Sequence, residues 1–184
     1  MDYKISGEIH LIGAPILRTV GIPIVDFSPE LGIFFGQMDR IMRADQGIGI
    51  AAQQVGLAVR CCIVDVSECA AEGKDFCILN GNPVAPQAIM PLYICNPKIV
   101  AAEHLCTLRE GCLSIPHFRY EIERPETITV FFSDPKGNAQ KITCNGVLAR
   151  CMQHEFDHLD GKLFIDWLSP SGEKKFKRFL KNRE

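Results

Sequence analysis

Two histidines lie four residues apart in the segment His154-Glu155-Phe156-Asp157-His158. If this segment is helical, their rings are offset by about 6 Å along the axis and about 40° around it, so both can reach one metal ion. The intervening Glu155 can act as a general base toward a water molecule activated by that ion. The spacing therefore indicates a hydrolytic metal site. The alternative is a pair of ordinary histidines whose hydrogen bonds are satisfied within the helix.

A tetrahedral catalytic site needs a third protein ligand and keeps the fourth position open for water. No histidine follows His158, and the downstream acids are close in sequence and poorly placed for this role: Asp160, Asp166 and Glu173. An upstream cysteine is more plausible. Cys112 follows Gly111, which lets the backbone approach a site closely. Composition alone gives Cys112 only a modest advantage over the other eight cysteines.

The elements that must position these residues are helices and antiparallel strands in separate runs. One helix is predicted to begin at Ser28-Pro29-Glu30 and to end before Gly47. A second should run over 147–160 with Gly161 as its C′ residue, and a third from Pro170 to the end, capped by Ser169. Strands are predicted near 58–66, 91–95, 98–109, 126–133 and 139–144.

This pattern predicts an α+β domain over residues 1–184. We expect antiparallel β-sheets packed around a central helix that carries the two histidines, with an N-terminal and a C-terminal helix. Residues 67–90 contain several glycine and proline breakers, which is typical of an insertion loop.

Length and composition fit one globular domain, with 184 residues, 47% hydrophobic and 23% charged. A net charge of −2 gives no overall attraction to DNA or to a membrane. We find neither a signal-peptide pattern nor a run that approaches the roughly 18 apolar residues of a membrane span. We therefore expect a cytoplasmic monomer. The nine cysteines form no C-x-x-C pair, which argues against a disulfide framework or a zinc ribbon.

Three segments resemble the motifs of the peptide deformylase family, and they occur in the family's order. They are the segments 47–56 (GIGIAAQQVG), 110–114 (EGCLS) and 153–161 (QHEFDHLDG). The starting segment 15–18 (PILR) is similar as well. Each motif alone is moderately specific, and the three together are highly specific. The more particular resemblance is to the bacterial type with a C-terminal helix.

The resemblance implies an enzyme that hydrolyses the N-terminal formyl group of formyl-methionyl peptides on nascent proteins and releases formate. It assigns Cys112, His154 and His158 as metal ligands, with Fe²⁺ as the native ion and Zn²⁺, Ni²⁺ or Co²⁺ as possible occupants. Glu155 would move the proton, while the side-chain amide of Gln54 and the backbone N–H of Leu113 would donate to the oxyanion.

The same resemblance implies how the substrate binds. Ile48, Gly49, Cys151 and His154 would line a slot for the methionine side chain. Gly49 and Gly111 would allow the substrate backbone to pair like an added strand. Arg119 would face the peptide, although a solvent-exposed loop arginine is an equal alternative.

The chain departs from the family pattern in two places. Gln53 stands where proline is usual, which leaves Gln54 as the catalytic amide by register, with Gln53 as the alternative. The stretch between Gln54 and Cys112 is also longer than in common bacterial members, with 67–90 as the extra segment.

Residues 171–184 carry six Lys or Arg and two Glu, and this basic run resembles the C-terminal helix of the bacterial subtype that docks at the ribosome. The resemblance implies contact with ribosomal RNA phosphates. A solvated amphipathic helix is the alternative for this segment. For the whole chain, a zinc endopeptidase with the same helix and a catalytically silent binding protein of the same fold remain alternatives.

Overall fold

The computed structural model describes Tyr3, Ile5 and residues 7–69 and 75–182. Its helices are α1 (Pro29–Ala44), α2 (Gly146–Leu159) and α3 (Pro170–Lys181), with short 3₁₀ turns η1 (Pro15–Arg18), η2 (Ala52–Val55), η3 (Pro86–Ile89) and η4 (Phe164–Trp167). Its strands are β1 (Gly49–Ala51), β2 (Cys61–Val64), β3 (Cys77–Leu79), β4 (Asn82–Pro83), β5 (Leu92–Cys112), β6 (Ile115–Ser133) and β7 (Ala139–Cys144).

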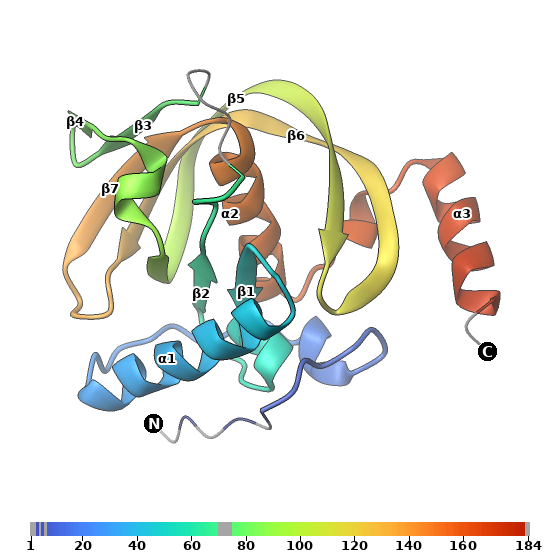
Figure 1. Cartoon of the computed structure of the whole chain (residues 1–184), viewed down its shortest axis with the longest axis horizontal. Coiled ribbons are helices and arrows are strands. Elements are labelled where there is room, and N and C mark those ends of the chain that lie inside the picture. The colour runs from blue at the N-terminus through green and yellow to red at the C-terminus, as the bar shows by residue number, and fades with distance from the viewer. Residues whose placement is uncertain (1–2, 4, 6, 70–74, 183–184) are drawn as a thin grey trace.

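The described strands pair antiparallel into one sheet in the order β1-β2-β5-β6-β7-β3-β4. Figure 1 shows this sheet curving around α2, while α1 lies outside it near β1 and β2 and α3 stands apart at the other end. The predicted α+β class, with a central helix between an N-terminal and a C-terminal helix, is confirmed.

The four residues of β2 are all buried, because this strand lies between two hydrophobic cores. Cys61 and Ile63 pack into a core with the apolar stripe of α1, while Cys62 and Val64 pack into a core with α2. Successive side chains of a strand point to opposite faces, so a continuous apolar run is expected where both faces are covered. This strand anchors the sheet directly beneath the helix that carries the two histidines.

Both ends of α2 are set by glycines. Gly146 at its start has φ +63° and Gly161 after its end has φ +68°, a region that favours glycine. A Cβ at Gly161 would lie 2.7 Å from the carbonyl oxygen of Arg18, so the chain could not pass here with a side chain. The predicted helix 147–160 therefore begins one residue earlier and ends one residue earlier than expected.

The largest difference from the predicted strands is the hairpin of β5 and β6. Separate strands were expected at 91–95, 98–109 and 126–133, whereas β5 runs unbroken to Cys112 and β6 begins at Ile115. The predicted strand 98–109 lies within β5, although its residues 98–105 are exposed on both faces. The strand residues that were not predicted are mainly 115–125 of β6, where Pro116 and Pro125 argue against a strand in a local pattern. Two register shifts between Cys95 and Ala101 bend the hairpin as β-bulges do.

The segment 67–90, predicted as an insertion loop, contains β3, β4 and η3 among its described residues. β3 pairs with β7 and extends the sheet at the edge farthest from β1. Residues 70–74, which belong to the predicted insertion, lie outside the described residues. Among the described helices, none combines the length and the apolar character needed to cross a membrane.

Candidate metal centre

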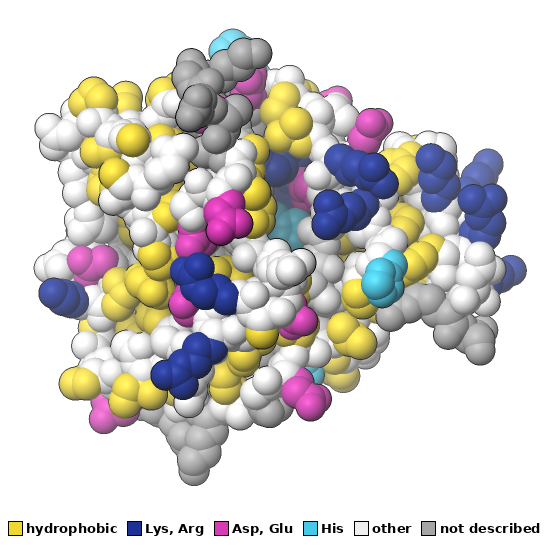
Figure 2. Space-filling view, in the orientation of Figure 1, with side chains coloured by type: hydrophobic (Ala, Val, Ile, Leu, Met, Phe, Trp, Pro, Cys, Tyr) yellow, Lys and Arg dark blue, Asp and Glu magenta, His cyan; other side chains and the backbone are white. Residues whose placement is uncertain are grey.

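The tip of the β5–β6 hairpin meets the inner face of α2. Cys112 and Ile115 pair across a turn formed by Leu113 and Ser114, so Cys112 stands at the tip. His154 and His158 lie one helical turn apart on α2, and their ring centroids are 5.1 Å apart. Figure 2 shows histidine surface at the bottom of a hollow in this face of the molecule.

Cys112, His154 and His158 bring one ligand atom each to within 4.8 Å of one another. The Sγ of Cys112 lies 3.3 Å from the Nε2 of His158. One thiol and two imidazoles are a donor set that suits Zn²⁺ and other late first-row divalent ions, and three protein ligands leave a position open. Among the described residues, no other cluster of three or more His, Cys, Asp or Glu has this geometry.

Two of the downstream acids are engaged elsewhere. Asp160 accepts a hydrogen bond of 2.7 Å from Arg60, and Asp166 accepts one of 3.0 Å from Arg18. The thiol that the structure places with the two histidines is that of Cys112, which lies upstream of the helix as the resemblance implied.

The Glu155 carboxyl lies beside the cluster in an apolar setting. Its side chain is 3% exposed, and Oε2 has no hydrogen-bond partner among the described residues. Burial raises the pKa of Glu155 to about 7. A carboxyl with a pKa near neutrality can both accept and return a proton, as a general acid–base group must.

Gly49 makes room for this carboxyl. A Cβ at Gly49 would lie 2.7 Å from the Sγ of Cys151 and would collide with the Oε1 of Glu155. Cys151 in turn donates to the carbonyl of Ile48 at 3.3 Å. Of the residues predicted to bind substrate, Gly49 and Cys151 thus lie beside Glu155, while the exposed Ile48 contacts Cys151 through its carbonyl.

The two neighbouring glutamines have different surroundings. Gln54 donates from Nε2 to the Oγ of Ser114 at 3.2 Å and to the Sγ of Cys112 at 3.6 Å, while its Oε1 accepts from the N–H of Ala51 at 2.8 Å. Its amide nitrogen is therefore turned toward the cluster. Gln53 is also buried, but its Nε2 points to the carbonyl of Thr19. The geometry favours Gln54 over Gln53 as the amide at the site.

The remaining predicted residues lie on the hairpin. Leu113 occupies the turn after Cys112, and its Cδ1 would lie 2.7 Å from a Cβ on Gly47. Gly111 pairs with Arg119 across the hairpin, and a Cβ on Gly111 would meet the Cγ of Arg119 at 3.0 Å. Arg119 is exposed, so its guanidinium is accessible from solvent near the tip.

A buried ionic network behind His154 was not predicted from the sequence. Glu110 bonds the Nδ1 of His154 at 2.9 Å and accepts from Arg124 at 2.7 and 3.0 Å and from Arg150 at 2.9 Å. Arg124 also donates to Asp157 at 2.7 Å. Charged residues at positions where the helix and strand patterns predict apolar ones could have indicated a buried network. Such a pattern does not indicate which of these residues contact one another.

Burial and neighbouring charges shift the pKa values of Glu110 and of His158. Burial raises the pKa of Glu110, but the hydrogen bonds from His154 and Arg124 outweigh it and bring that pKa to about 2. Burial and the neighbouring His154 lower the pKa of His158 well below its ordinary value, which favours the neutral imidazole that binds metals. With Nδ1 of His154 held by Glu110, its Nε2 is left for a metal ion.

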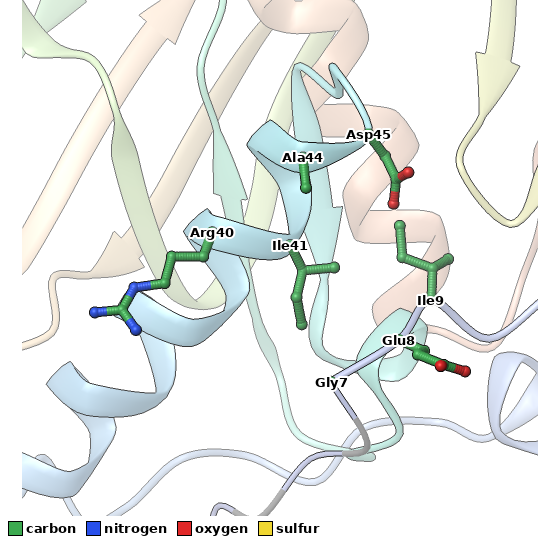
Figure 3. Close-up of a pocket in the computed structure, with 7 residues that line it drawn as sticks. All are labelled: Gly7, Glu8, Ile9, Arg40, Ile41, Ala44 and Asp45. Carbon is green, nitrogen blue, oxygen red and sulfur yellow. The ribbon is translucent and has the colours of Figure 1, made fainter.

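A separate hollow lies between the N-terminal segment and α1 (Figure 3). It is lined by Gly7, Glu8, Ile9, Arg40, Ile41, Ala44 and Asp45. None of the residues predicted to act on a substrate lines it. Its mixed apolar and charged lining, with Arg40 directed away from Asp45 in Figure 3, contains no group of metal ligands.

The fold and the cluster together define an α+β protein built around a candidate Cys-His-His metal centre. The family model described as polypeptide deformylase matches residues 7–174 of this chain. A peptide deformylase of Opitutus terrae is 41% identical over 154 residues, which cover 83% of this chain and 79% of the relative. A peptide deformylase of Brucella suis biovar 1 is 37% identical over 174 residues, which cover 92% of this chain and 90% of the relative.

Solved structures agree with these relatives. A peptide deformylase from Synechococcus elongatus in complex with actinonin has a TM-score of 0.75 and 34% identity, over 90% of this chain and 80% of that one. A plant peptide deformylase has a TM-score of 0.84 and 28% identity, over 100% of this chain and 92% of that one. The chain therefore belongs to the polypeptide deformylase family, as its three motifs predicted.

Proposed function

We propose that the protein hydrolyses the N-terminal formyl group of formyl-methionyl peptides on nascent proteins, releasing formate and a free α-amino group. The observation that carries this proposal is the cluster of Cys112, His154 and His158 beside the buried, unpartnered carboxyl oxygen of Glu155. Family membership supports the choice of substrate, since the relatives above are named peptide deformylases.

Cys112, His154 and His158 would hold one divalent ion, with Fe²⁺ as the proposed native occupant. An ion held there would act as a Lewis acid and lower the pKa of a water molecule at the site. A thiolate among the ligands makes oxidation a hazard, so we expect an Fe²⁺-loaded protein to lose activity in air.

Glu155 takes the proton of the attacking water as the new O–C bond forms at the formyl carbon. It then gives this proton to the departing amide nitrogen as the C–N bond breaks. The Nε2 of Gln54 and the backbone N–H of Leu113 would donate to the oxygen on which negative charge develops. The bond from Ala51 to the Oε1 of Gln54 fixes which end of that amide faces the site.

The methionine side chain would enter the region bounded by Ile48, Gly49 and Cys151, beside His154. The exposed backbone at Gly111 would pair with the substrate as an added strand, and Arg119 would contact the peptide beyond the methionine. A formyl group is small enough for such a site, whereas the extra methyl of an acetyl group would clash.

Formate release from a formyl-methionyl tripeptide tests this proposal, using protein purified without oxygen and loaded with Fe²⁺. We expect turnover that is lost when Glu155→Ala is introduced, while the metal content of the variant stays equal to that of wild type. A full metal site without formate would contradict the proposal. Cleavage of internal bonds in unformylated peptides would instead favour the endopeptidase alternative.

We also propose that α3 contacts ribosomal RNA phosphates. Lys and Arg side chains gather over α3 at the right of Figure 2, and the basic residues of this helix are exposed: Lys174, Lys175, Lys177, Arg178 and Lys181. Phe176 and Phe179 pack the helix against Phe118, and their ring centroids lie 4.8 and 5.1 Å from that of Phe118. Ribosome co-sedimentation should fall with rising salt and on deletion of 171–184. Binding that survives the deletion would contradict this proposal.

A further inference from the structure

Arg150 is a buried cation that takes no part in the proposed chemistry. It lies on α2 one turn before His154, and its side chain is 6% exposed. Its Nη1 donates to the Oε1 of Glu110 at 2.9 Å and to the carbonyl of Ile122 at 2.8 Å, while Nη2 donates to the carbonyl of Cys106 at 2.7 Å. One guanidinium thus connects α2 to both strands of the β5–β6 hairpin.

Glu110 receives hydrogen bonds on both carboxyl oxygens. Oε1 accepts from Arg150 and from the Nε of Arg124, while Oε2 accepts from the Nη2 of Arg124 and bonds the Nδ1 of His154. Arg124 reaches Glu110 from β6, whereas Arg150 reaches it from α2. The carboxyl is therefore fixed relative to both elements that supply metal ligands, because Cys112 belongs to the hairpin and His154 to the helix.

From this geometry we infer that Arg150 is a positioning residue of the metal centre. It acts through Glu110, whose orientation sets the direction of the His154 ring and so the place of its Nε2. Hydrogen bonds from outer groups to ligating histidines hold the ring and the tautomer that binds the metal. The inference rests on the proposed function in so far as the cluster binds a metal ion.

A purely structural role for Arg150 makes a different prediction. Removing one partner of a buried ion pair lowers stability, although here Glu110 would keep Arg124 and His154 as partners. If Arg150 only fastened the hairpin, its loss would change the stability of the metal-free protein and leave the intrinsic metal affinity intact. If it positions His154, the affinity changes even where the fold is retained.

The chain offers a matched control in Gln153. This residue is 6% exposed on the same helix, and its Nε2 donates to the carbonyl of Pro125 at 2.9 Å and to that of Ala149 at 3.0 Å. It therefore also connects α2 to β6, but its side chain makes no bond to Glu110. Gln153→Met removes a contact between helix and hairpin without touching the carboxyl behind His154.

The experiment is an oxygen-free titration of the metal-free proteins with Co²⁺, followed by its absorption bands, beside a thermal unfolding scan of each metal-free protein. We expect Arg150→Met to weaken Co²⁺ binding about tenfold, at the low end of what outer hydrogen-bond partners contribute. Gln153→Met should lower the unfolding midpoint and keep the wild-type affinity. Wild-type affinity in Arg150→Met, or equal losses in both variants, would overturn the inference.

Two further variants protect the test against misfolding and against indirect effects. Arg150→Lys keeps the charge but cannot reach Glu110 and both carbonyls together, so its affinity should lie between those of wild type and Arg150→Met. In a Glu110→Gln background, Arg150→Met should weaken Co²⁺ binding no further, because its effect runs through that carboxyl. An additive loss there would overturn the inference.

Failure of the proposed function would look different. If wild-type protein binds no Co²⁺, the proposed metal centre is contradicted, and so is the role of Arg150. If wild-type protein binds Co²⁺ and releases formate while Arg150→Met binds the ion equally well, only the role of Arg150 is removed.

Discussion

Two buried carboxyls lie on opposite sides of α2, and their pKa values are shifted in opposite directions. On the side facing the β5–β6 hairpin, Glu110 is surrounded by Arg124, Arg150 and His154, and its pKa falls to about 2. On the side facing β1, Glu155 lies beside Gly49 and Cys151 with one oxygen unpartnered, and its pKa rises to about 7. Environments that push two carboxyls apart in pKa separate their roles. On the hairpin side, Glu110 fixes the orientation of His154. On the β1 side, Glu155 remains able to exchange a proton.

The largest expected effect comes from removing the reactive carboxyl. Glu155→Gln should lower the rate of formate release by about 10³-fold, within the range that general acid–base groups contribute. It should leave the metal content unchanged, because Glu155 is not among the ligands. Steady-state kinetics beside metal analysis check both parts. A variant that retains near wild-type turnover would show that the β1 side has no catalytic role.

Glu110→Gln should break the hairpin side instead. It leaves Arg124 and Arg150 buried without their shared anion, which we expect to lower the free energy of unfolding by about 3–5 kcal/mol. Metal affinity should also fall by roughly 10- to 100-fold. Urea unfolding and Co²⁺ titration measure the two effects. Unchanged stability would mean that the network around Glu110 contributes nothing to holding the helix against the hairpin.

Gly49→Ala should disturb the β1 side by crowding it. The added Cβ would meet Glu155 and Cys151, so both must shift. We expect turnover to fall by about 10²-fold, as a misplacement near 1 Å can produce, with a loss of about 1–3 kcal/mol in stability from overpacking. Kinetics and thermal unfolding distinguish the two. Gly47→Ala, which crowds Leu113 instead, provides the comparison at the hairpin tip.

The smallest expected effect comes from Trp167, which lies at the exposed end of the network around Glu110. Trp167 donates from Nε1 to the Oδ2 of Asp157 at 2.8 Å, on the same oxygen that Arg124 contacts. Trp167→Phe removes this bond, and because the side chain is half exposed we expect a loss of only about 1 kcal/mol. Metal affinity should be unchanged. A weaker metal site in this variant would extend the positioning network beyond Glu110.

Local signals were sufficient to predict α2 and the two histidines that it carries toward the candidate cluster. Gly161 ends the helix as its position predicted, and the spacing of His154 and His158 places both rings on one face. The resemblance then supplied Cys112, which the residues alone could not single out among nine cysteines. The structure also separates Gln54 from Gln53, a choice that depends on which amide reaches Cys112 across 58 residues of chain.

The ionic network could not be predicted from local pattern. Arg124 and Arg150 lie 14 and 40 residues after Glu110, so only the folded hairpin packed against α2 brings the three together. The full length of that hairpin was missed for a related reason. Residues 115–125 of β6 contain Pro116 and Pro125, which argue against a strand in a local pattern, and only the pairing with β5 shows that they belong to one.

One measurement tests the central claim most directly, namely that the Cys112 cluster and Glu155 together deformylate peptides. Oxygen-free, Fe²⁺-loaded protein is given a formyl-methionyl tripeptide, and formate and free amino termini are counted against bound metal. The account predicts one formate per new amino terminus, at a rate proportional to the metal content, with no reaction on the acetylated peptide. Bound metal without formate, or new amino termini arising inside the peptide, would contradict it.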